Sequence, residues 1–238
     1  METNNKPANE YFGYRNIRPE DYSNFRMPRY LLEALAGDKN ARILDIGCGF
    51  GQMLKCLRNE GYPNIYGADI SKEAVEYCKS TGLNVEEISN LEEYSNKHSK
   101  AFDFVIMSHV LEHIEKHKII ETLSIVKKIL LSENGKLLVM VPNAQSNTGC
   151  YWAYEDFTHT TLFTTGSLFY VLKAAGFNQI EFLDPQCVND LSFMKRVIVK
   201  VLLKIYIMNK DFWNKVTSSS YHKPSPRIYG FEIRALAM

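Results

Sequence analysis

The sequence lacks an uninterrupted apolar run of the roughly 18 residues that a membrane-spanning helix needs. Its first ten residues are polar and show no signal-peptide pattern. Its cysteines are odd in number and have no metal-site spacing, so we interpret them as reduced thiols: Cys48, Cys56, Cys78, Cys150 and Cys187. These absences predict a cytoplasmic protein without transmembrane helices or structural disulfides.

Several kinds of chemistry are missing as well. No G-K-[ST] loop supports nucleotide hydrolysis, and no histidine–carboxylate cluster has metal-ligand spacing, so we expect no metal. The core has no basic stripe interleaved with aromatics, which argues against a nucleic-acid partner.

The net charge of +1 conceals an uneven distribution of charge. Residues 1–190 carry 19 basic and 25 acidic side chains, whereas residues 191–238 carry 9 basic and 2 acidic ones. This pattern indicates an anionic substrate or surface, or else a solvated basic helix face.

Apolar runs alternate with amphipathic segments along most of the chain, which predicts an α/β fold with a parallel sheet and helices on both faces. We expect strands at 42–46, 64–69, 83–88, 102–107, 136–141, 178–183 and 227–236. We expect helices at 22–37, 51–60, 71–80, 90–97, 115–131 and 165–175. Residues 1–40 form an N-terminal arm and helix, and 41–238 form one domain with insertions at 143–163 and 185–226.

The run Ile43–Gly51 reads as a buried strand, an acidic residue and a glycine-rich turn that opens a helix. Asp69 ends the next strand 22 residues after Gly47, where a carboxylate can accept hydrogen bonds from both hydroxyls of a ribose. The turn is G-x-G-x-G, and Asp45 precedes it by two residues. That carboxylate would repel a pyrophosphate and attract a ligand with a cationic amine.

The pattern D-x-G-C-G-x-G resembles motif I of class I methyltransferases, which use S-adenosylmethionine. The resemblance covers roughly residues 26–184. It implies a Rossmann-like, doubly wound sheet of seven mostly parallel strands with an antiparallel last strand. Asn90 replaces the commoner Asp of the adenine-binding position. The resemblance implies these cofactor contacts: Asp45, Gly47, Cys48, Gly49, Asp69, Ile70, Asn90, Leu91 and Ser108.

Residues 102–114 are similar to the fourth-strand motif F-D-x-V-x-x-x-x-V-L-E-H-I of small-molecule methyltransferases. In that family the strand tip lies beneath the methionine part of the cofactor. The resemblance therefore implies that Ser108 and His109 lie close to the transferred methyl group, and that His109 is a candidate contact of the acceptor. We interpret His113 as structural.

Residues 154–177 resemble the D-x-T-H…F-T…S-L…A-G-F pattern of bacterial methyltransferases found in capsule, O-antigen and nucleotide-sugar pathways. Methyl transfer to a hydroxyl benefits from a general base, and histidine titrates near neutrality. We expect His159 to be that base and Asp156, three residues earlier, to orient it. Alternatively, both residues cap the following helix and pin the loop.

Residues 191–216 mix lysines with apolar and aromatic side chains. They predict a basic amphipathic helix that either contacts a membrane surface or partner, or packs on the domain with its lysine stems over apolar area. We favour packing. The arm from Tyr11 to Arg29 can fold over the cofactor, although surface charge is the simpler interpretation of its arginines.

These expectations combine into an S-adenosylmethionine-dependent O-methyltransferase. The resemblance and the basic tail suggest an anionic small-molecule acceptor, namely a sugar hydroxyl or phosphate-like oxygen of a surface-polysaccharide precursor. Two alternatives stay open. One is a methyltransferase for a quinone, lipid or natural product, and the other is a non-catalytic, cofactor-binding partner subunit.

Overall fold

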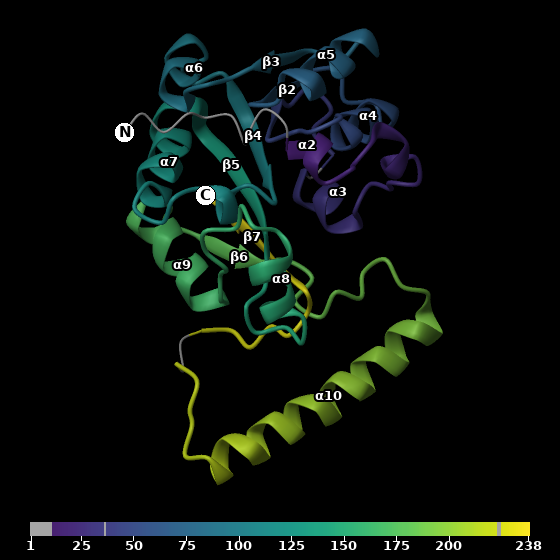
Figure 1. Cartoon of the computed structure of the whole chain (residues 1–238), viewed down its shortest axis with the longest axis vertical. Coiled ribbons are helices and arrows are strands. Elements are labelled where there is room, and N and C mark those ends of the chain that lie inside the picture. The colour runs from purple at the N-terminus through teal and green to yellow at the C-terminus, as the bar shows by residue number, and fades with distance from the viewer. Residues whose placement is uncertain (1–10, 36, 223–224) are drawn as a thin grey trace.

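A seven-stranded sheet forms the centre of the structure, a computed structural model that describes residues 11–35, 37–222 and 225–238. The strands are β1 (Ile43–Ile46), β2 (Ile65–Asp69), β3 (Val85–Glu87), β4 (Phe102–Ser108), β5 (Leu131–Pro142), β6 (Ile180–Phe182) and β7 (Glu232–Ala237). Their order is β3-β2-β1-β4-β5-β7-β6 (Figure 1). The last strand, β7, runs antiparallel to β5 and β6, whereas β1 to β5 pair in parallel. The predicted Rossmann-like fold is confirmed.

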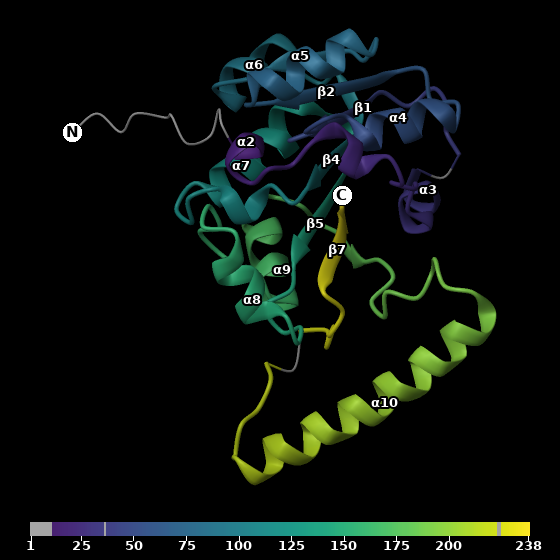
Figure 2. The ribbon, with the colours of Figure 1, turned by 45° about the vertical axis from the view of Figure 1, so that its right-hand side comes forward.

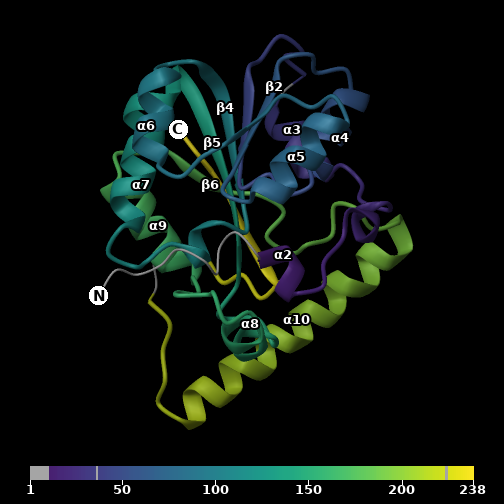
Figure 3. The same cartoon turned by 45° about the horizontal axis from the view of Figure 1, so that its top comes forward.

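Helices cover both faces of this sheet. The helices are α2 (Tyr11–Tyr14), α3 (Arg29–Leu35), α4 (Gln52–Asn59), α5 (Lys72–Ser80), α6 (Leu91–Lys97), α7 (Ile119–Ile125), α8 (Gly149–Glu155), α9 (Thr165–Ala174) and α10 (Phe193–Val216). Short turns of other helix types are η1 (Pro19–Tyr22), η2 (Leu111–His113) and η3 (Val126–Leu130). In Figures 1 and 3, α3, α4 and α5 lie over one face, and α6, α7 and α9 lie over the other.

The sheet residues alternate between two buried clusters. In β4, Phe104 and Ile106 pack toward α3, α4 and α5, whereas Val105 and Met107 pack toward α7 and α9. This alternation follows from the two-residue period of a strand. It explains why β4 reads as a continuous apolar run, since both of its faces are covered.

Some boundaries differ from those predicted. The expected helix over 22–37 is confined to α3, preceded by the short turn η1, and the arm before it contains the single-turn helix α2. The helix expected to reach residue 131 ends at Leu130, because β5 already begins at Leu131 beside Phe102. We predicted no helix at the position of α8. The last strand covers Glu232–Ala237, whereas we predicted residues 227–236. The polar residues 1–10 lie outside the described parts of the chain.

The two expected insertions have different relations to the sheet. Residues 143–163 contain α8. The end of this insertion lies beside its beginning, because Phe163 forms a β-bridge with Asn143, the residue that follows β5. Residues 185–226 contain the 24-residue helix α10, which lies apart from the sheet, beyond α8, in Figures 1 and 2. None of the residues of α10 is buried, so the packing that we favoured from the sequence is wrong for most of its surface. Within the described ranges, we find no helix with the length and apolar character that crossing a membrane requires.

Candidate functional site

The carboxyl ends of β1 and β2 bring two carboxylates together. Asp45 pairs in register with Gly67 of β2, and Asp69 ends that strand. The Asp45 side chain is only 3% exposed, and its Oδ1 has no hydrogen-bond partner among the described residues. Burial, with a further contribution from the charge of Asp69, raises the pKa of Asp45 to about 8. An unpaired buried carboxyl of this kind is expensive, which makes it a candidate to receive a cationic ligand group.

Asp69 is already bonded to the backbone around it. Its Oδ2 accepts a hydrogen bond from the Gly49 amide and its Oδ1 accepts one from the Ser71 amide, both at 2.8 Å. Burial raises the pKa of Asp69, and the backbone donors partly offset this. Each carboxylate oxygen has a second acceptor position. Asp69 can therefore hold the turn and still accept bonds from a ligand, and its ribose-binding role stays a prediction.

The glycine turn, residues 47–51, needs its glycines for different reasons. Gly47, Gly49 and Gly51 all have positive φ, at 72°, 52° and 74°. A Cβ on Gly47 would lie 2.5 Å from Val110, and one on Gly51 would lie 2.5 Å from Leu83. A Cβ on Gly49 would instead make an ordinary contact, 3.4 Å from the Phe12 ring. Two glycines are thus required by packing, whereas Gly49 faces the N-terminal helix.

The remaining predicted cofactor residues occupy varied environments. The side chain of Cys48 is buried in the core, so only its backbone remains available to a ligand. Asn90 caps α6, because its Oδ1 accepts from the amides of Glu92 and Glu93. Ile70 is half exposed, while Leu91 packs against the core. Their roles, and that of Ser108 at the end of β4, stay predictions.

Helix α2 links the glycine turn to α8. The Phe12 ring packs on Phe50 with centroids 4.5 Å apart. The Tyr11 hydroxyl donates to Asp156 Oδ2 at 2.7 Å, and Arg15 forms ion pairs with Glu155 and Asp156. The expected arm therefore does close across this edge of the sheet, but Arg15 is paired with carboxylates of the chain itself.

The loop after α8 holds His159 in one orientation. Its Nδ1 lies 2.6 Å from the carbonyl oxygen of Trp152, which can only accept, so in the neutral ring Nδ1 carries the proton and Nε2 a lone pair. Asp156 Oδ2 lies 3.7 Å from Nε2, beyond hydrogen-bond length. The expected orienting contact is thus supplied by the Trp152 carbonyl rather than by Asp156. The His159 side chain is 6% exposed.

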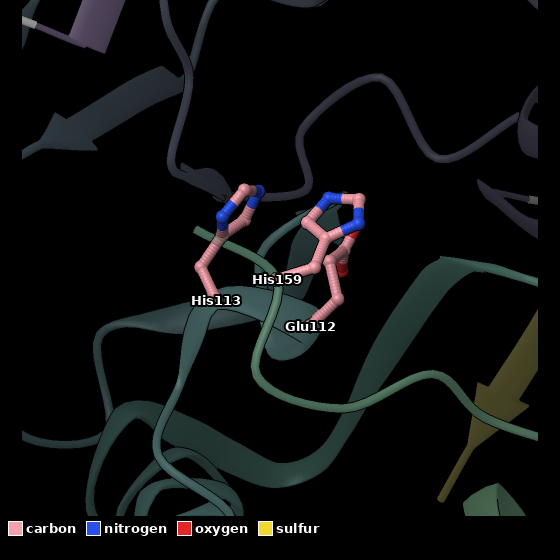
Figure 4. A group of neighbouring side chains, drawn as sticks. All are labelled: Glu112, His113 and His159. Atoms are coloured by element: carbon pink, nitrogen blue, oxygen red, sulfur yellow. The ribbon is translucent and has the colours of Figure 1, made fainter. Parts of the chain in front are cut away.

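Figure 4 shows His159 beside two residues that follow β4, Glu112 and His113. The amide of Thr160 donates to the Glu112 carbonyl at 2.7 Å and pins the loop there. The Thr158 hydroxyl donates to Asp156 and accepts from His113 Nδ1, which leaves His113 Nε2 with a lone pair. Burial lowers the pKa of His113.

Ligand-type atoms of Glu112, His113 and His159 lie within 4.8 Å of one another. Glu112 is completely buried, and its Oε2 has no partner among the described residues. Imidazole nitrogens and a carboxylate are ligand types that suit a divalent cation such as zinc. The sequence could not reveal this group, because His159 belongs to a different segment. The expectation of no metal stays a prediction.

His109 lies on the other side of Glu112, at the tip of β4, with a positive φ of 55°. Its Nδ1 lies 3.2 Å from Glu112, and its Nε2 lies 2.8 Å from Glu232 of β7. Burial alone would lower the pKa of His109, but the two carboxylates outweigh it and raise the pKa to about 10. The ring is therefore protonated at neutral pH. Glu232 in turn pairs with Arg234, and neither residue carried a sequence signal.

A family model described as a methyltransferase domain matches residues 14–181, which is more than half of the chain. The chain belongs to this methyltransferase family. Membership confirms the prediction of an S-adenosylmethionine-dependent methyltransferase.

The similarity to individual relatives is partial. The ubiquinone biosynthesis O-methyltransferase of Salmonella newport is 30% identical over 90 residues, or 36% of this chain and 37% of that protein. The same protein of Salmonella typhimurium matches equally. The match therefore spans little more than a third of these curated relatives.

Solved structures share the fold over nearly the whole chain. A SAM-dependent methyltransferase from Archaeoglobus fulgidus superposes with a TM-score of 0.65 at 22% identity, covering 95% of this chain and 97% of that one. A possible histamine N-methyltransferase from Thermotoga maritima gives 0.58 at 16% identity, covering 96% and 94%. At these identities the likeness establishes the fold alone.

The residues at the strand ends fit S-adenosylmethionine. The unpartnered Asp45 Oδ1 can accept from its amine. Gly47 is exposed and has no side chain, so a ligand can approach the backbone of the turn there. Asp69 retains free acceptor positions for ribose hydroxyls. This fit rests on atoms of the chain and is independent of its relatives.

Proposed function

We propose that this methyltransferase transfers a methyl group to the hydroxyl oxygen of a small aromatic acceptor of the phenol or hydroquinone type. The observation that carries the proposal is the orientation of His159, whose Nε2 is left with a lone pair while the ring lies beside Glu112 and His113, which follow β4. The partial similarity to the ubiquinone biosynthesis O-methyltransferases supports the acceptor class. So do the exposed aromatic side chains Tyr151, Tyr154 and Phe157 on the segment that carries His159.

The cofactor half of the site has a binding role. S-adenosylmethionine, when bound, supplies an electrophilic methyl group. Asp45 would bind its amine, the glycine turn would pass beneath it, and Asp69 would bind its ribose. Phe12 and Tyr11 would cover the turn and exclude water, which strengthens the electrostatic contacts there.

The acceptor half has a proton-transfer role. His159 Nε2 accepts the acceptor's hydroxyl proton while the Trp152 carbonyl holds Nδ1–H. A phenol, with a pKa of about 10, is a far easier proton donor to histidine than a sugar alcohol is. His109 is unsuited to this role because it is already protonated, but its positive charge can stabilise a developing phenolate.

The sugar-hydroxyl acceptor expected from the loop motif stays a prediction. Its electrostatic argument relied on the basic residues after position 190, and six of these lie on α10. The hydrogen bond that joins α10 to the acceptor segment comes from Tyr206 and not from a basic side chain. The anionic character of the acceptor therefore has less support than the aromatic one.

A panel of acceptors tests the proposal. The purified protein and S-adenosylmethionine are incubated with a water-soluble catechol, a nucleotide-linked sugar and an inorganic phosphate, and products are identified by mass spectrometry. We expect a mono-methylated catechol. Methylation of the nucleotide sugar alone would overturn the proposal in favour of the polysaccharide acceptor. Cofactor binding without any product would favour the non-catalytic partner subunit.

A further inference from the structure

Helix α10 presents an exposed apolar arc along its whole length. The arc comprises Met194, Val197, Ile198, Val201, Ile205, Met208, Phe212 and Val216, which are 47–73% exposed. At 100° per residue these side chains fall within about a third of the helix circumference. A 24-residue helix is about 36 Å long, so the arc is a long, continuous apolar surface.

The opposite side of α10 faces the domain. Its half-buried residues include Val199, Leu203 and Tyr206. The Tyr206 hydroxyl donates to Asn147 Oδ1 at 2.7 Å, and its ring packs on Tyr229. Because this side is already directed at the domain, the apolar arc cannot be covered by a simple rotation of the helix. The apolar arc therefore points away from the molecule.

The charges on α10 indicate which kind of partner covers the apolar arc. The helix carries six basic residues, and its single acid, Asp211, is ion-paired with Arg227. On the helical projection Lys200, Lys204 and Lys215 flank one side of the arc, and Lys195 flanks the other beside Trp213. Lysines bordering an apolar arc can extend their charged ends toward anionic headgroups while the arc enters the acyl boundary.

A second copy of the helix is a poorer partner. Helix pairs that associate through an apolar seam usually carry opposite charges along its borders. Two α10 helices packed through this arc would bring lysine against lysine, with no free acid on either to compensate. The arc is also broader than the narrow stripe of a two-helix seam.

We propose that α10 is an interfacial helix that docks this methyltransferase on an anionic lipid bilayer through its apolar arc. The contact between Tyr206 and Asn147 attaches α10 to the segment that follows β5, which also carries His159. Docking therefore holds the acceptor side of the site close to the lipid surface. The docking itself goes beyond the proposed function and does not depend on it.

Vesicle flotation tests the docking without requiring turnover. The full chain is mixed with vesicles of phosphatidylcholine plus phosphatidylglycerol, or with vesicles of phosphatidylcholine alone. We expect flotation with the anionic vesicles and little with the neutral ones, and we expect added salt to weaken it. Absence of flotation with anionic vesicles at low salt would overturn the proposal.

Two sets of variants locate the binding surface. Val201→Asp with Ile205→Asp should abolish flotation, whereas Phe169→Asp with Tyr170→Asp, an equal charge change at exposed residues of α9, should not. Replacement of Lys195, Lys200 and Lys204 by Gln should weaken flotation at least roughly tenfold. The same change at the exposed Lys79, Lys97 and Lys128 should matter much less.

Analytical sedimentation of the same proteins measures their oligomeric state and so tests whether a second copy of α10 covers the arc. The wild type could prove to be a dimer that becomes a monomer when Val201→Asp and Ile205→Asp are combined. If the wild type also fails to float, the arc is a contact between two copies of the chain and the proposal is wrong. Circular dichroism and cofactor binding confirm that each variant is folded. Failure of flotation would leave the catechol assay unaffected, so the two proposals fail separately.

Discussion

The two halves of the proposed site are built in contrasting ways. The cofactor half, at the ends of β1 and β2, is local, since Asp45, the glycine turn and Asp69 lie within 25 consecutive residues. The acceptor half is assembled from distant segments: His109 and Glu112 after β4, His159 after α8, and Glu232 in β7. The comparison predicts that substitutions in one half change cofactor affinity and substitutions in the other change turnover.

The largest expected effect is on turnover. His159→Ala should lower kcat by roughly 10²–10⁴, because it removes the proposed general base. Cofactor affinity should stay the same, since His159 lies in the acceptor half. His117→Ala, at a histidine exposed in the loop before α7, is the matched control and should retain wild-type kcat. A loss below fivefold would assign His159 to loop structure.

The next effect concerns the glycine turn. Gly49→Val places a branched side chain against the Phe12 ring, in the turn that we propose lies beneath the cofactor, at a φ of 52°. We expect calorimetry to detect no cofactor binding while the circular dichroism spectrum persists. Gly61→Val imposes comparable backbone strain at φ 84° in open space, so it separates strain from obstruction. If the Gly49→Val and Gly61→Val proteins bound the cofactor equally well, the turn would have only a structural role.

A smaller effect is expected where α2 meets α8. Tyr11→Phe deletes the hydroxyl that donates to Asp156 but keeps the ring contacts with Phe12 and His113. A hydrogen bond to a charged group contributes about 1.5–3 kcal/mol, so the midpoint of thermal unfolding should fall by several degrees. Tyr170→Phe, at an exposed tyrosine of α9, should leave the midpoint unchanged. Equal midpoints for both variants would show that the link contributes nothing to stability.

The smallest effect is on pH dependence. The folded-state pKa of His109, about 10, exceeds the ordinary value of about 6.5, so protonated His109 stabilises the fold fully below about 6.5. That contribution should disappear as the pH rises toward 10. The free-energy gap between wild type and His109→Gln in urea unfolding should therefore shrink between these pH values. NMR titration of the ring near pH 6.5 would contradict the assignment.

The same contrast explains what the sequence could predict. The turn after β1 and the place of Asp69 at the end of β2 could be predicted because both depend on residues close together in the sequence. Their roles in binding a cofactor stay predictions. Glu232 was missed because strand pairing brings it to His109 from 123 residues further along the chain. The Trp152 carbonyl is only seven residues from His159, but it was missed because a backbone carbonyl carries no signal in the sequence. The amphipathic pattern of α10 correctly predicted a helix, but it could not tell an apolar arc that packs on the domain from one that faces outward.

The central claim is that the ends of β1 and β2 hold S-adenosylmethionine. Calorimetric titration of the cofactor into wild type and Asp69→Ala tests it most directly. Asp69 would bond both ribose hydroxyls, and each charge-assisted bond is worth about 1.5–3 kcal/mol, so affinity should fall at least tenfold. Folding of the variant is checked by circular dichroism, because Asp69 also bonds the amides of Gly49 and Ser71. Unchanged affinity in a folded Asp69→Ala protein would contradict the claim.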